Sequence, residues 1–236
     1  MYLNNVLFIL VLYKMACKDS KAYQSLCALL SQEYLADSLY IHDNTLCNTY
    51  LVGAYTQGYQ MALQRGKRWV VFLDADATIT QAYLDMLKQD VSSDNYSVLV
   101  PRLVSSDGKQ LSPTKRYGIQ VAFNSCMAMR TDVIQQIGGF DGRYPLDYLD
   151  YYTCWQLKKH GVVIHSMDVQ LLHQLSVNDY ADVTRDRYCS ILNAEKQFAT
   201  DIGRIWQYRL LLVARCCKWL LTCHKYTLLT IKHLFG

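Results

Sequence analysis

The first 90 or so residues switch repeatedly between continuous apolar runs and a helical period, which predicts strands separated by helices. A continuous apolar run is typical of a strand that is buried on both faces of a sheet. The predicted strands are Val6–Tyr13, Leu39–His42 and Trp69–Leu73. The predicted helices are Lys21–Ser31, Val52–Arg65 and Gln81–Val91. Asp19 and Ser20 are expected to cap the first helix, and Gly66 to end the second.

The pattern is less regular in the second half of the chain. Tyr96–Val104 and Gly118–Met129 have the apolar character of strands, and residues 105–116 between them have the polar character of a loop. Thr131 is expected to cap a short helix that ends at the glycines 138 and 139. The other predicted elements are a helix at Leu146–His160 and strands at Val162–His165 and Val169–Leu172.

This order of elements predicts the fold class. Strands separated by helices of about 10–15 residues form right-handed βαβ crossovers and a mainly parallel sheet, so we expect an α/β fold. In such sheets, ligands bind beyond the carboxyl ends of the strands. Tyr13, Asp43 and Asp74 follow or end three of the predicted strands, and a nucleotide site at that edge would collect them.

Residues 74–78, DADAT, place two carboxylates one residue apart at the end of a predicted strand. Asp74 and Asp76 in this arrangement suit Mg²⁺ or Mn²⁺, which takes one or two protein carboxylates together with phosphate oxygens and water. Such a cation neutralises the charge on a departing diphosphate. The pattern D-x-D-x-T is also a phosphohydrolase signature in which Asp74 would be the nucleophile. A solvated turn after the strand is a third explanation.

The position of Asp74 in the chain disfavours the phosphohydrolase. The nucleophile of that family follows the first strand of the core, whereas two predicted βα units precede Asp74. The later acids, Asp147 and Asp150, lie within helical periodicity rather than at a strand end. Their spacing of three residues puts both on one face near the start of the predicted helix. The helix dipole favours acids there without any functional role, but the surrounding string at 138–161 favours one.

Seven short strings in the chain resemble motifs of one known family. They are VLYK (11–14), HDNT (42–45), GAYTQGY (53–59), FLDADAT (72–78), FNSCMAMR (123–130), IGGFDGRYPLDYLDYY (137–152) and LLHQLS (171–176). Together they resemble the inverting nucleotide-sugar glycosyltransferases of family 2, which have a GT-A fold and a DXD motif. The similarity is greatest to bacterial rhamnosyltransferase-like enzymes of cell-surface polysaccharide synthesis, and it runs from about Val6 to about Phe198.

The resemblance implies a role for each acid of the nucleotide half. Asp43, with Asn44 beside it, would bind the uracil or thymine ring. Asp74 would contact the ribose or a metal-bound water. Asp76 would ligate Mg²⁺ or Mn²⁺ through the diphosphate of the donor.

The resemblance also assigns residues of the second half. Asn124 and Ser125 would line the substrate site. Asp150 would be the general base, and Asp147 would orient the acceptor or the start of the helix. His173 would be a metal ligand or bind a phosphate, although a hydrogen-bonded histidine of the core explains it equally well.

Some positions depart from the family pattern. Thr56 stands where the family often has asparagine, Cys126 where it often has glycine, and Gln156 where it often has arginine. Ala75 and Ala77 replace a glutamine and a polar residue that are commoner in the D-x-D loop. These changes leave the acids in place and bear mainly on the identity of the donor.

Composition changes this picture in two respects. The nine cysteines include no CxxC pair, so we expect reduced thiols in a cytosolic setting. No signal peptide is expected, and no apolar run reaches the roughly 20 residues that a transmembrane helix needs.

Charge is distributed unevenly along the chain. The net charge is +4, but all six lysines and arginines after Asp201 are unmatched by any acid, which leaves residues 1–201 at −2. The tail has a predicted polar stripe of Arg204, Gln207, Arg215, Lys218, Thr222, Lys225 and Lys232. Its predicted apolar positions are Trp206, Leu210, Val213, Cys217, Leu220, Leu221, Leu228, Ile231 and Leu234.

A wide apolar arc beside a cationic stripe is typical of amphipathic helices that lie in a membrane surface. We therefore expect the tail to associate with a membrane whose anionic headgroups attract its cations. The alternatives are that the tail packs on the catalytic domain or forms a homodimer. Nucleic acid is not an expected partner, because leucine rather than polar or stacking residues separates the cations.

The predicted organisation is a GT-A domain at 1–200, with a nucleotide-binding half (1–95) and an acceptor and catalytic half (96–200), followed by a basic amphipathic tail (201–236). The predicted function is metal-dependent, inverting transfer of a sugar from a UDP- or dTDP-linked donor to a saccharide or lipid-linked saccharide. The protein would be peripheral on the cytoplasmic face of the plasma membrane. The alternatives are the phosphohydrolase with Asp74 as nucleophile and a non-catalytic, membrane-bound partner protein.

Overall fold

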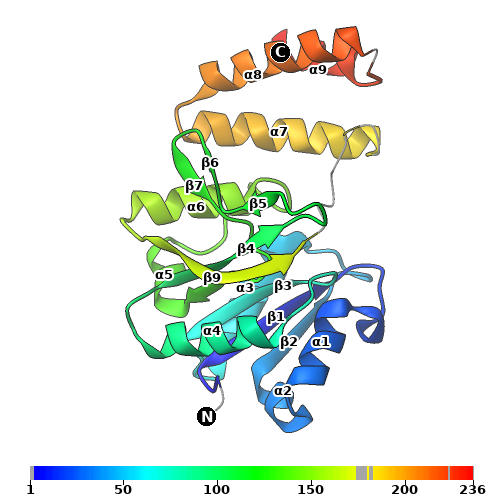
Figure 1. Ribbon diagram of the computed structural model, residues 1–236. Coiled ribbons are helices and arrows are strands. Elements are labelled where there is room, and N and C mark those ends of the chain that lie inside the picture. The colour runs from blue at the N-terminus through cyan, green and yellow to red at the C-terminus, as the bar shows by residue number, and fades with distance from the viewer. Residues whose placement is uncertain (1–2, 174–179, 181–182, 223, 236) are drawn as a thin grey trace. The chain divides into compact units, whose positions relative to one another are not determined.

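The structure is a computed structural model that describes residues 3–173, 180, 183–222 and 224–235 (Figure 1). The chain forms two compact units, Met1–Gln174 and Leu175–Gly236, called unit 1 and unit 2 below. The division lies between residues 174 and 175, whereas the sequence placed a domain boundary after residue 200. The reason is a helix at 185–201, which was not predicted and which packs within unit 2.

Unit 1 is built on a seven-stranded sheet in the order β2-β1-β3-β8-β4-β5, with β9 paired to β4. The strands are β1 (Val6–Leu12), β2 (Leu39–Asp43), β3 (Trp69–Asp74), β4 (Val98–Val104), β5 (Gln110–Ser112), β8 (Ala128–Arg130) and β9 (Ile164–Leu172). β1 pairs in parallel with β2 and β3, and β4 pairs in parallel with β9. β8 and β5 run antiparallel to their neighbours, so the sheet is mixed and mainly parallel, as predicted.

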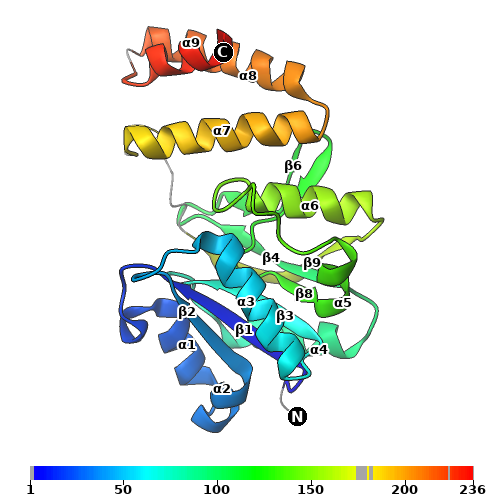
Figure 2. The same ribbon diagram turned by 180° about the vertical axis from the view of Figure 1, so that it is seen from behind.

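Helices cover both faces of this sheet (Figures 1 and 2). The helices of unit 1 are α1 (Lys21–Leu29), α2 (Gln32–Ser38), α3 (Tyr50–Gln64), α4 (Gln81–Ser92), α5 (Thr131–Gln136) and α6 (Leu149–Lys159), with a 3₁₀ turn at Cys17–Asp19. Alternate residues of β1 point to opposite faces. Phe8 and Leu10 pack in one core with residues of α1, α2 and α4. Figure 2 shows α3 and α5 on the other face.

The close packing of α3 on that face depends on a glycine. A Cβ atom added at Gly58 would lie 2.6 Å from the side chain of Ile9 on β1. The small-residue spacing of the string at 53–59 therefore has a packing role, because it lets the helix backbone approach the strand. α3 in turn carries the buried Tyr55.

The second half of unit 1 differs from prediction in several places, and β5 already lies within the stretch expected to be a loop at 105–116. The stretch expected to be one strand at 118–129 is divided into β7 (Ile119–Val121) and β8, and β7 pairs with β6 (Thr114–Arg116) in a separate hairpin. The two strands expected at 162–172 are one strand, β9. The helix expected from Leu146 begins at Leu149, because Tyr148 has a left-handed backbone with φ of 64°.

Unit 2 consists of α7 (Arg185–Asp201), α8 (Ile205–Leu221) and α9 (Thr227–Phe235). Its core contains Tyr188, Leu192, Ala199, Tyr208, Leu212, Trp219 and Tyr226. Thr184 caps α7 by accepting a hydrogen bond from the backbone N–H of Arg187 at 3.3 Å. The prediction of one or two amphipathic helices in the tail is confirmed by α8 and α9.

One residue of the predicted polar stripe faces the interior of unit 2. The guanidinium of Arg215 lies 3.1 Å from the carboxylate of Glu195, and their side chains are only 14% and 1% exposed. The ring of Tyr180 lies 5.3 Å from the same guanidinium. Arg215 is therefore an internal ion-pair partner and not part of a solvent-facing cationic stripe.

Two further predictions concern the chain as a whole. The eight described cysteines are all free, as expected of reduced thiols, and Cys223 lies outside the described residues. Among the described residues, no helix combines the length and the apolar character required to cross a membrane.

Candidate active site

The candidate site lies at one edge of the sheet. β1, β2, β3, β4 and β9 run in the same direction, so their carboxyl ends meet at this edge. Tyr13 follows β1, Asp43 ends β2, Asp74 ends β3 and His173 follows β9. The antiparallel strand β8 begins at the same edge, which brings the preceding residues 122–127 there as well.

The acidic loop after β3 is held by the start of α1. The hydroxyl of Ser20 donates to the carbonyl of Ala75 at 2.9 Å, and the backbone N–H of Ala22 reaches the same carbonyl at 3.3 Å. The Ser20 hydroxyl also accepts from the N–H of Tyr23 at 3.2 Å, so one side chain both caps α1 and fixes the residue between the two acids. Asp74 is half-buried and Asp76 is exposed.

The electrostatic environment of Asp74 shows which side chains lie near it. Burial raises the pKa of the Asp74 carboxyl, the neighbouring His173 lowers it, and the like charge of Asp76 raises it again. The nearby hydroxyl of Ser125 lowers this pKa, although no hydrogen bond of standard geometry joins the hydroxyl to the carboxylate. Segments after β3, before β8 and after β9 therefore converge on one carboxylate.

The loop at 122–127 has a strained turn at Cys126, whose φ is 59°. This left-handed region favours glycine, so a cysteine at this position is held there by its surroundings. The turn is fixed by hydrogen bonds from the Cys126 N–H to Phe72 O and from the Tyr83 hydroxyl to Cys126 O, both 2.8 Å. It buries Asn124 and Ser125, whose Oδ1 and Oγ atoms have no hydrogen-bond partner among the described residues.

Asp150 lies in the first turn of α6 and is close enough to Asp74 for the charge of Asp74 to act on its carboxyl. Its Oδ1 atom accepts a hydrogen bond from the Tyr151 N–H at 2.9 Å. Burial is the main cause that raises the pKa of Asp150 to about 7, and the charges of Asp74 and Asp147 add to the effect. Asp147 precedes the helix, so the two acids flank Tyr148 rather than sharing a helix face.

Tyr55 was not singled out from the sequence, although it lies between the two halves of the site. Burial raises the pKa of its hydroxyl well above the usual range, and both Asp74 and Asp150 raise it further. Its ring packs against Phe72 and Phe140, with centroid distances of 4.4 and 5.5 Å. Three aromatic rings are therefore packed together next to the acids. Tyr55 occupies an ordinary apolar position of a helix, so its place beside both acids could not be recognised from the sequence.

Asp43 and Asn44 have different surroundings at the end of β2. Asp43 is exposed, and its carboxylate accepts from the Thr45 N–H at 2.8 Å, which helps to lower its pKa. Asn44 is buried; its Oδ1 accepts from the Thr49 N–H at 2.9 Å and its amide donates to Tyr50 O at 3.2 Å. The Asn44 side chain therefore shapes the loop, and a direct contact with substrate stays a prediction.

The donors at this edge are suited to a hard divalent cation. Asp74 and Asp76 supply carboxylates, and Mg²⁺ typically takes one or two of these while keeping water and substrate phosphates. The unpartnered oxygen atoms of Asn124 and Ser125 add polar groups nearby. In the part of the chain that the structure describes, no group of three or more His, Cys, Asp or Glu side chains is arranged to hold a metal. His173 as a third ligand stays a prediction, and residues 174–176 of its motif lie outside the described residues.

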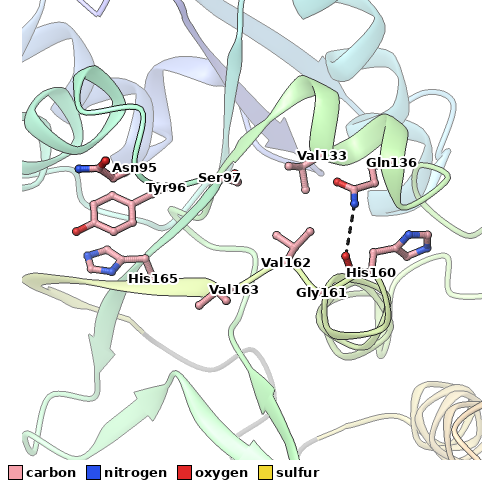
Figure 3. Close-up of a pocket in the computed structure, with 10 residues that line it drawn as sticks. All are labelled: Asn95, Tyr96, Ser97, Val133, Gln136, His160, Gly161, Val162, Val163 and His165. Carbon is pink, nitrogen blue, oxygen red and sulfur yellow. Dashed lines mark hydrogen bonds between the residues drawn. The ribbon is translucent and has the colours of Figure 1, made fainter.

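A cavity of about 440 Å³ lies elsewhere, at the opposite edge of the sheet (Figure 3). Its walls come from the start of β4, from α5 and from the segment before β9, and the rings of Tyr96 and His165 stack there at 3.8 Å. Figure 3 also shows the Gln136 amide directed to the carbonyl of His160, at 3.5 Å. None of the predicted site residues lines this cavity, so it is distinct from the candidate site.

Comparisons with known proteins give two informative matches. The chain is 21% identical to dTDP-rhamnosyl transferase RfbF of Shigella flexneri over 166 residues, which are 61% of this chain and 55% of that protein. It is similar in structure to GalNAc-T7, crystallised with UDP, GalNAc and Mn²⁺, with a TM-score of 0.57 and 12% identity. This match covers 83% of the chain and 47% of GalNAc-T7. No protein-family model matches the chain.

These matches confirm the predicted α/β fold of GT-A type and the resemblance to rhamnosyltransferases. The chain spans about half the length of both proteins. At 12% identity the structural match establishes the fold alone, so activity, donor and acceptor are matters for proposal.

Proposed function

We propose that this chain is a glycosyltransferase that moves a sugar from a nucleotide-sugar donor to a hydroxyl of an acceptor, with inversion at the anomeric carbon. The observation that carries the proposal is the convergence of Asp74, Asp76 and Asp150. Asp74 ends β3 and Asp76 follows it in the loop, whereas Asp150 lies in the first turn of α6, 74 residues after Asp76. The charge of Asp74 nevertheless acts on Asp150. Similarity to a rhamnosyl transferase, together with the fold, supports the same reaction class.

Asp150 is proposed as the general base. Its carboxylate takes the proton of the acceptor hydroxyl while that oxygen forms a bond to the anomeric carbon. The bond from the anomeric carbon to the diphosphate oxygen breaks on the opposite face, and the electron pair leaves with the nucleoside diphosphate. A single base suffices for this displacement, and a base whose pKa lies near 7 is well matched to neutral pH.

Asp76 and Asp74 are proposed to hold Mg²⁺ or Mn²⁺, which when bound would neutralise charge on the leaving diphosphate. Ser125 and Asn124 lie beside this pair and would contact the donor through the oxygen atoms that have no other partner among the described residues. His173 would assist through its position near Asp74, as a metal ligand or as a contact to phosphate. Asp147 would orient the acceptor, because its charge raises the pKa of Asp150 and it therefore lies near the proposed base.

The donor is proposed to be a UDP- or dTDP-sugar whose base is read by Asp43. The Asp43 carboxylate is exposed at the end of β2, and burial opposes its charge only weakly. Tyr13 is exposed at the neighbouring strand end, with the ammonium of Lys14 5.1 Å from its ring. dTDP-rhamnose is the first donor to test, because the curated relative is named as a dTDP-rhamnosyl transferase.

The acceptor is proposed to be a saccharide or lipid-linked saccharide of cell-surface polysaccharide synthesis. The protein would then work on the cytoplasmic face of the plasma membrane as a peripheral protein. This placement follows from the resemblance and from the basic, apolar tail.

The test of the catalytic proposal is a thermal-shift panel of UDP- and dTDP-sugars with and without Mn²⁺, followed by a transfer assay on the donor that stabilises the protein. We expect stabilisation by at least one donor, and more with Mn²⁺. A phosphohydrolase would instead release phosphate without an acceptor and would trap aluminium or beryllium fluoride at Asp74. A non-catalytic partner protein would show no metal-dependent nucleotide binding, and either result would reject the proposal.

A further inference from the structure

The exposed face of α8 carries a continuous apolar stripe. Trp206, Leu210, Val213, Leu220 and Leu221 are between 44% and 88% exposed. Leu210 follows Trp206 by four residues and Val213 follows Leu210 by three, while Leu220 and Leu221 follow Val213 by seven and eight. These spacings keep all five on one side of a helix, and the exposed Cys217 lies on the same side. We call these six residues the α8 stripe.

The opposite face of α8 is already occupied within unit 2. Tyr208, Leu212, Cys216 and Trp219 are buried, and all but Cys216 belong to the core shared with α7 and α9. Arg215 points to the same side and pairs with Glu195. The α8 stripe is therefore not the face on which the unit folds. It is additional apolar surface of a kind that marks an interaction site.

Cations border the α8 stripe on both sides. By helical period, Arg209 lies along one side and Lys218 along the other, and both are exposed. Arg204 at the start of the helix and Lys225 and Lys232 beyond its end are also exposed. The chain has no acid after Asp201, so no carboxylate of its own offsets these charges within the segment.

α9 also exposes apolar side chains beside a cation, over a shorter length of helix. Leu228 and Phe235 are 74% and 84% exposed, and Lys232 lies between them at helical spacing. Trp206 and Phe235 provide large aromatic rings, which favour the boundary between lipid headgroups and acyl chains. Cationic side chains can bury their stems beside such apolar surface while their charged ends stay at the headgroups.

We propose that the α8 stripe lies in the headgroup boundary of an anionic phospholipid bilayer, with Arg209 and Lys218 contacting the headgroups on either side. Charge complementarity selects this occupant over a second copy of the chain. Two stripes facing each other would bring their own bordering cations together without any acid between them, whereas anionic lipids would attract them. The inference rests on no step of the transfer reaction.

The test is co-sedimentation of the full chain with vesicles of phosphatidylcholine alone and of phosphatidylcholine with about 30% phosphatidylglycerol, a composition anionic enough for the expected attraction. We expect the wild type to sediment with the anionic vesicles and at least about tenfold more weakly with the neutral ones. The double variant Leu210→Glu/Leu220→Glu should lose about tenfold or more of its vesicle partitioning. Leu63→Glu, at a 47% exposed leucine of α3 in unit 1, is the matched control and should bind as the wild type does.

A second pair of substitutions tests the cations. Arg209→Gln/Lys218→Gln should weaken binding to anionic vesicles about tenfold or more and leave binding to neutral vesicles nearly unchanged. Wild type that stays in the supernatant with both vesicles would overturn the proposal. So would a Leu210→Glu/Leu220→Glu variant that sediments normally, or a wild-type dimer that this variant dissociates without any vesicle binding. Turnover on a soluble acceptor should be unchanged in all these variants, which separates this test from that of the transfer reaction.

Discussion

Glu195 of unit 2 and Asp150 of unit 1 are both carboxylates withdrawn from water, but only Glu195 has a cation beside it. Glu195 is 1% exposed and lies 3.1 Å from the guanidinium of Arg215. Asp150 is half-buried and is bonded by a backbone N–H. Among the described residues, no lysine or arginine forms an ion pair with Asp150 or Asp74.

The difference separates an acid that holds the fold from the acids that we propose for the chemistry. A buried carboxylate without a counterion keeps a raised pKa and an unfavourable charged state, which a protein tolerates mainly where the charge is used. A buried ion pair satisfies both of its members, and removing one of them destabilises the fold. We therefore expect replacement of Asp150 in unit 1 to affect turnover, and replacement of Arg215 in unit 2 to affect stability.

The largest expected effect is on turnover in Asp150→Asn. The amide cannot take the acceptor proton, so turnover should fall about 10²–10⁴-fold while donor binding stays nearly intact. Turnover and donor affinity of the purified variant give the two numbers. Asp168→Asn, at an 87% exposed side chain on β9 that pairs with Arg102, is the control and should keep normal turnover. Normal turnover in Asp150→Asn would show that the base is another group.

The comparison predicts a stability defect without a catalytic one in Arg215→Met. This change leaves the Glu195 charge buried without its partner, which should destabilise unit 2 by about 3–5 kcal/mol. Hydrogen exchange of the α7 and α8 amides measures the loss directly. The double variant Glu195→Leu/Arg215→Met removes both charges and should recover most of the stability. If Arg215→Met were as stable as the wild type, the ion pair would not contribute to the stability of unit 2.

The pH dependence of the site should follow the raised pKa of Asp150. Only the ionised carboxylate accepts a proton, so turnover should rise with pH and level off above about 7, falling about tenfold per pH unit below that value. The stability effect has the opposite sign, because the pKa is higher in the folded than in the unfolded chain. The stability contributed by this group is complete below the ordinary pKa and is lost as pH rises through about 7.

Replacing the titrating group separates these two effects. Asp150→Asn should therefore be more stable than the wild type at about pH 8 and equally stable near pH 4, as measured by urea unfolding at both values. A stability difference that is the same at both pH values would contradict the assignment of the raised pKa to this carboxyl.

The sequence predicted the strands of the nucleotide half well because each is a continuous apolar run that ends at a polar residue. β1, β2 and β3 lie within one residue of the predicted bounds, and the edge that collects Asp43 and Asp74 follows from parallel pairing. The hairpin of β6 and β7 and the turn at Cys126 were not predicted, because an apolar string does not show where the backbone leaves the sheet. α7 was missed because charged and polar residues outnumber its apolar ones, so that its buried face is recognisable only from its packing partners.

The candidate site was inferred from the strings around the acids rather than from the spacing of the acids, and its residue roles stay predictions. Asp147 and Asp150 were placed on one helix face, and the left-handed residue Tyr148 between them removed Asp147 from the helix. Tyr55 is invisible in the sequence because its role depends on two acids from distant segments. The interior position of Arg215 depends in the same way on Glu195, which is 20 residues away. The periodicity of a sequence predicts helices and strands, but it does not predict which distant segments come together in the fold.

The smallest expected change in stability concerns two serine helix caps that have nearly the same geometry. Ser20 caps α1 by accepting from the Tyr23 N–H at 3.2 Å, and Ser31 caps α2 by accepting from the Tyr34 N–H at 3.3 Å. Replacing either serine by alanine should destabilise unit 1 by about 1 kcal/mol, as measured by urea unfolding.

Only Ser20 also donates to Ala75 O, at 2.9 Å, between the two acids of the loop. Ser20→Ala should therefore weaken the Mn²⁺-dependent stabilisation by the donor, whereas Ser31→Ala should leave it unchanged. Equal losses of Mn²⁺-dependent donor stabilisation in the two variants would show that the hydrogen bond to Ala75 does not position the acids. The metal contact would then depend on the strand end of β3 alone.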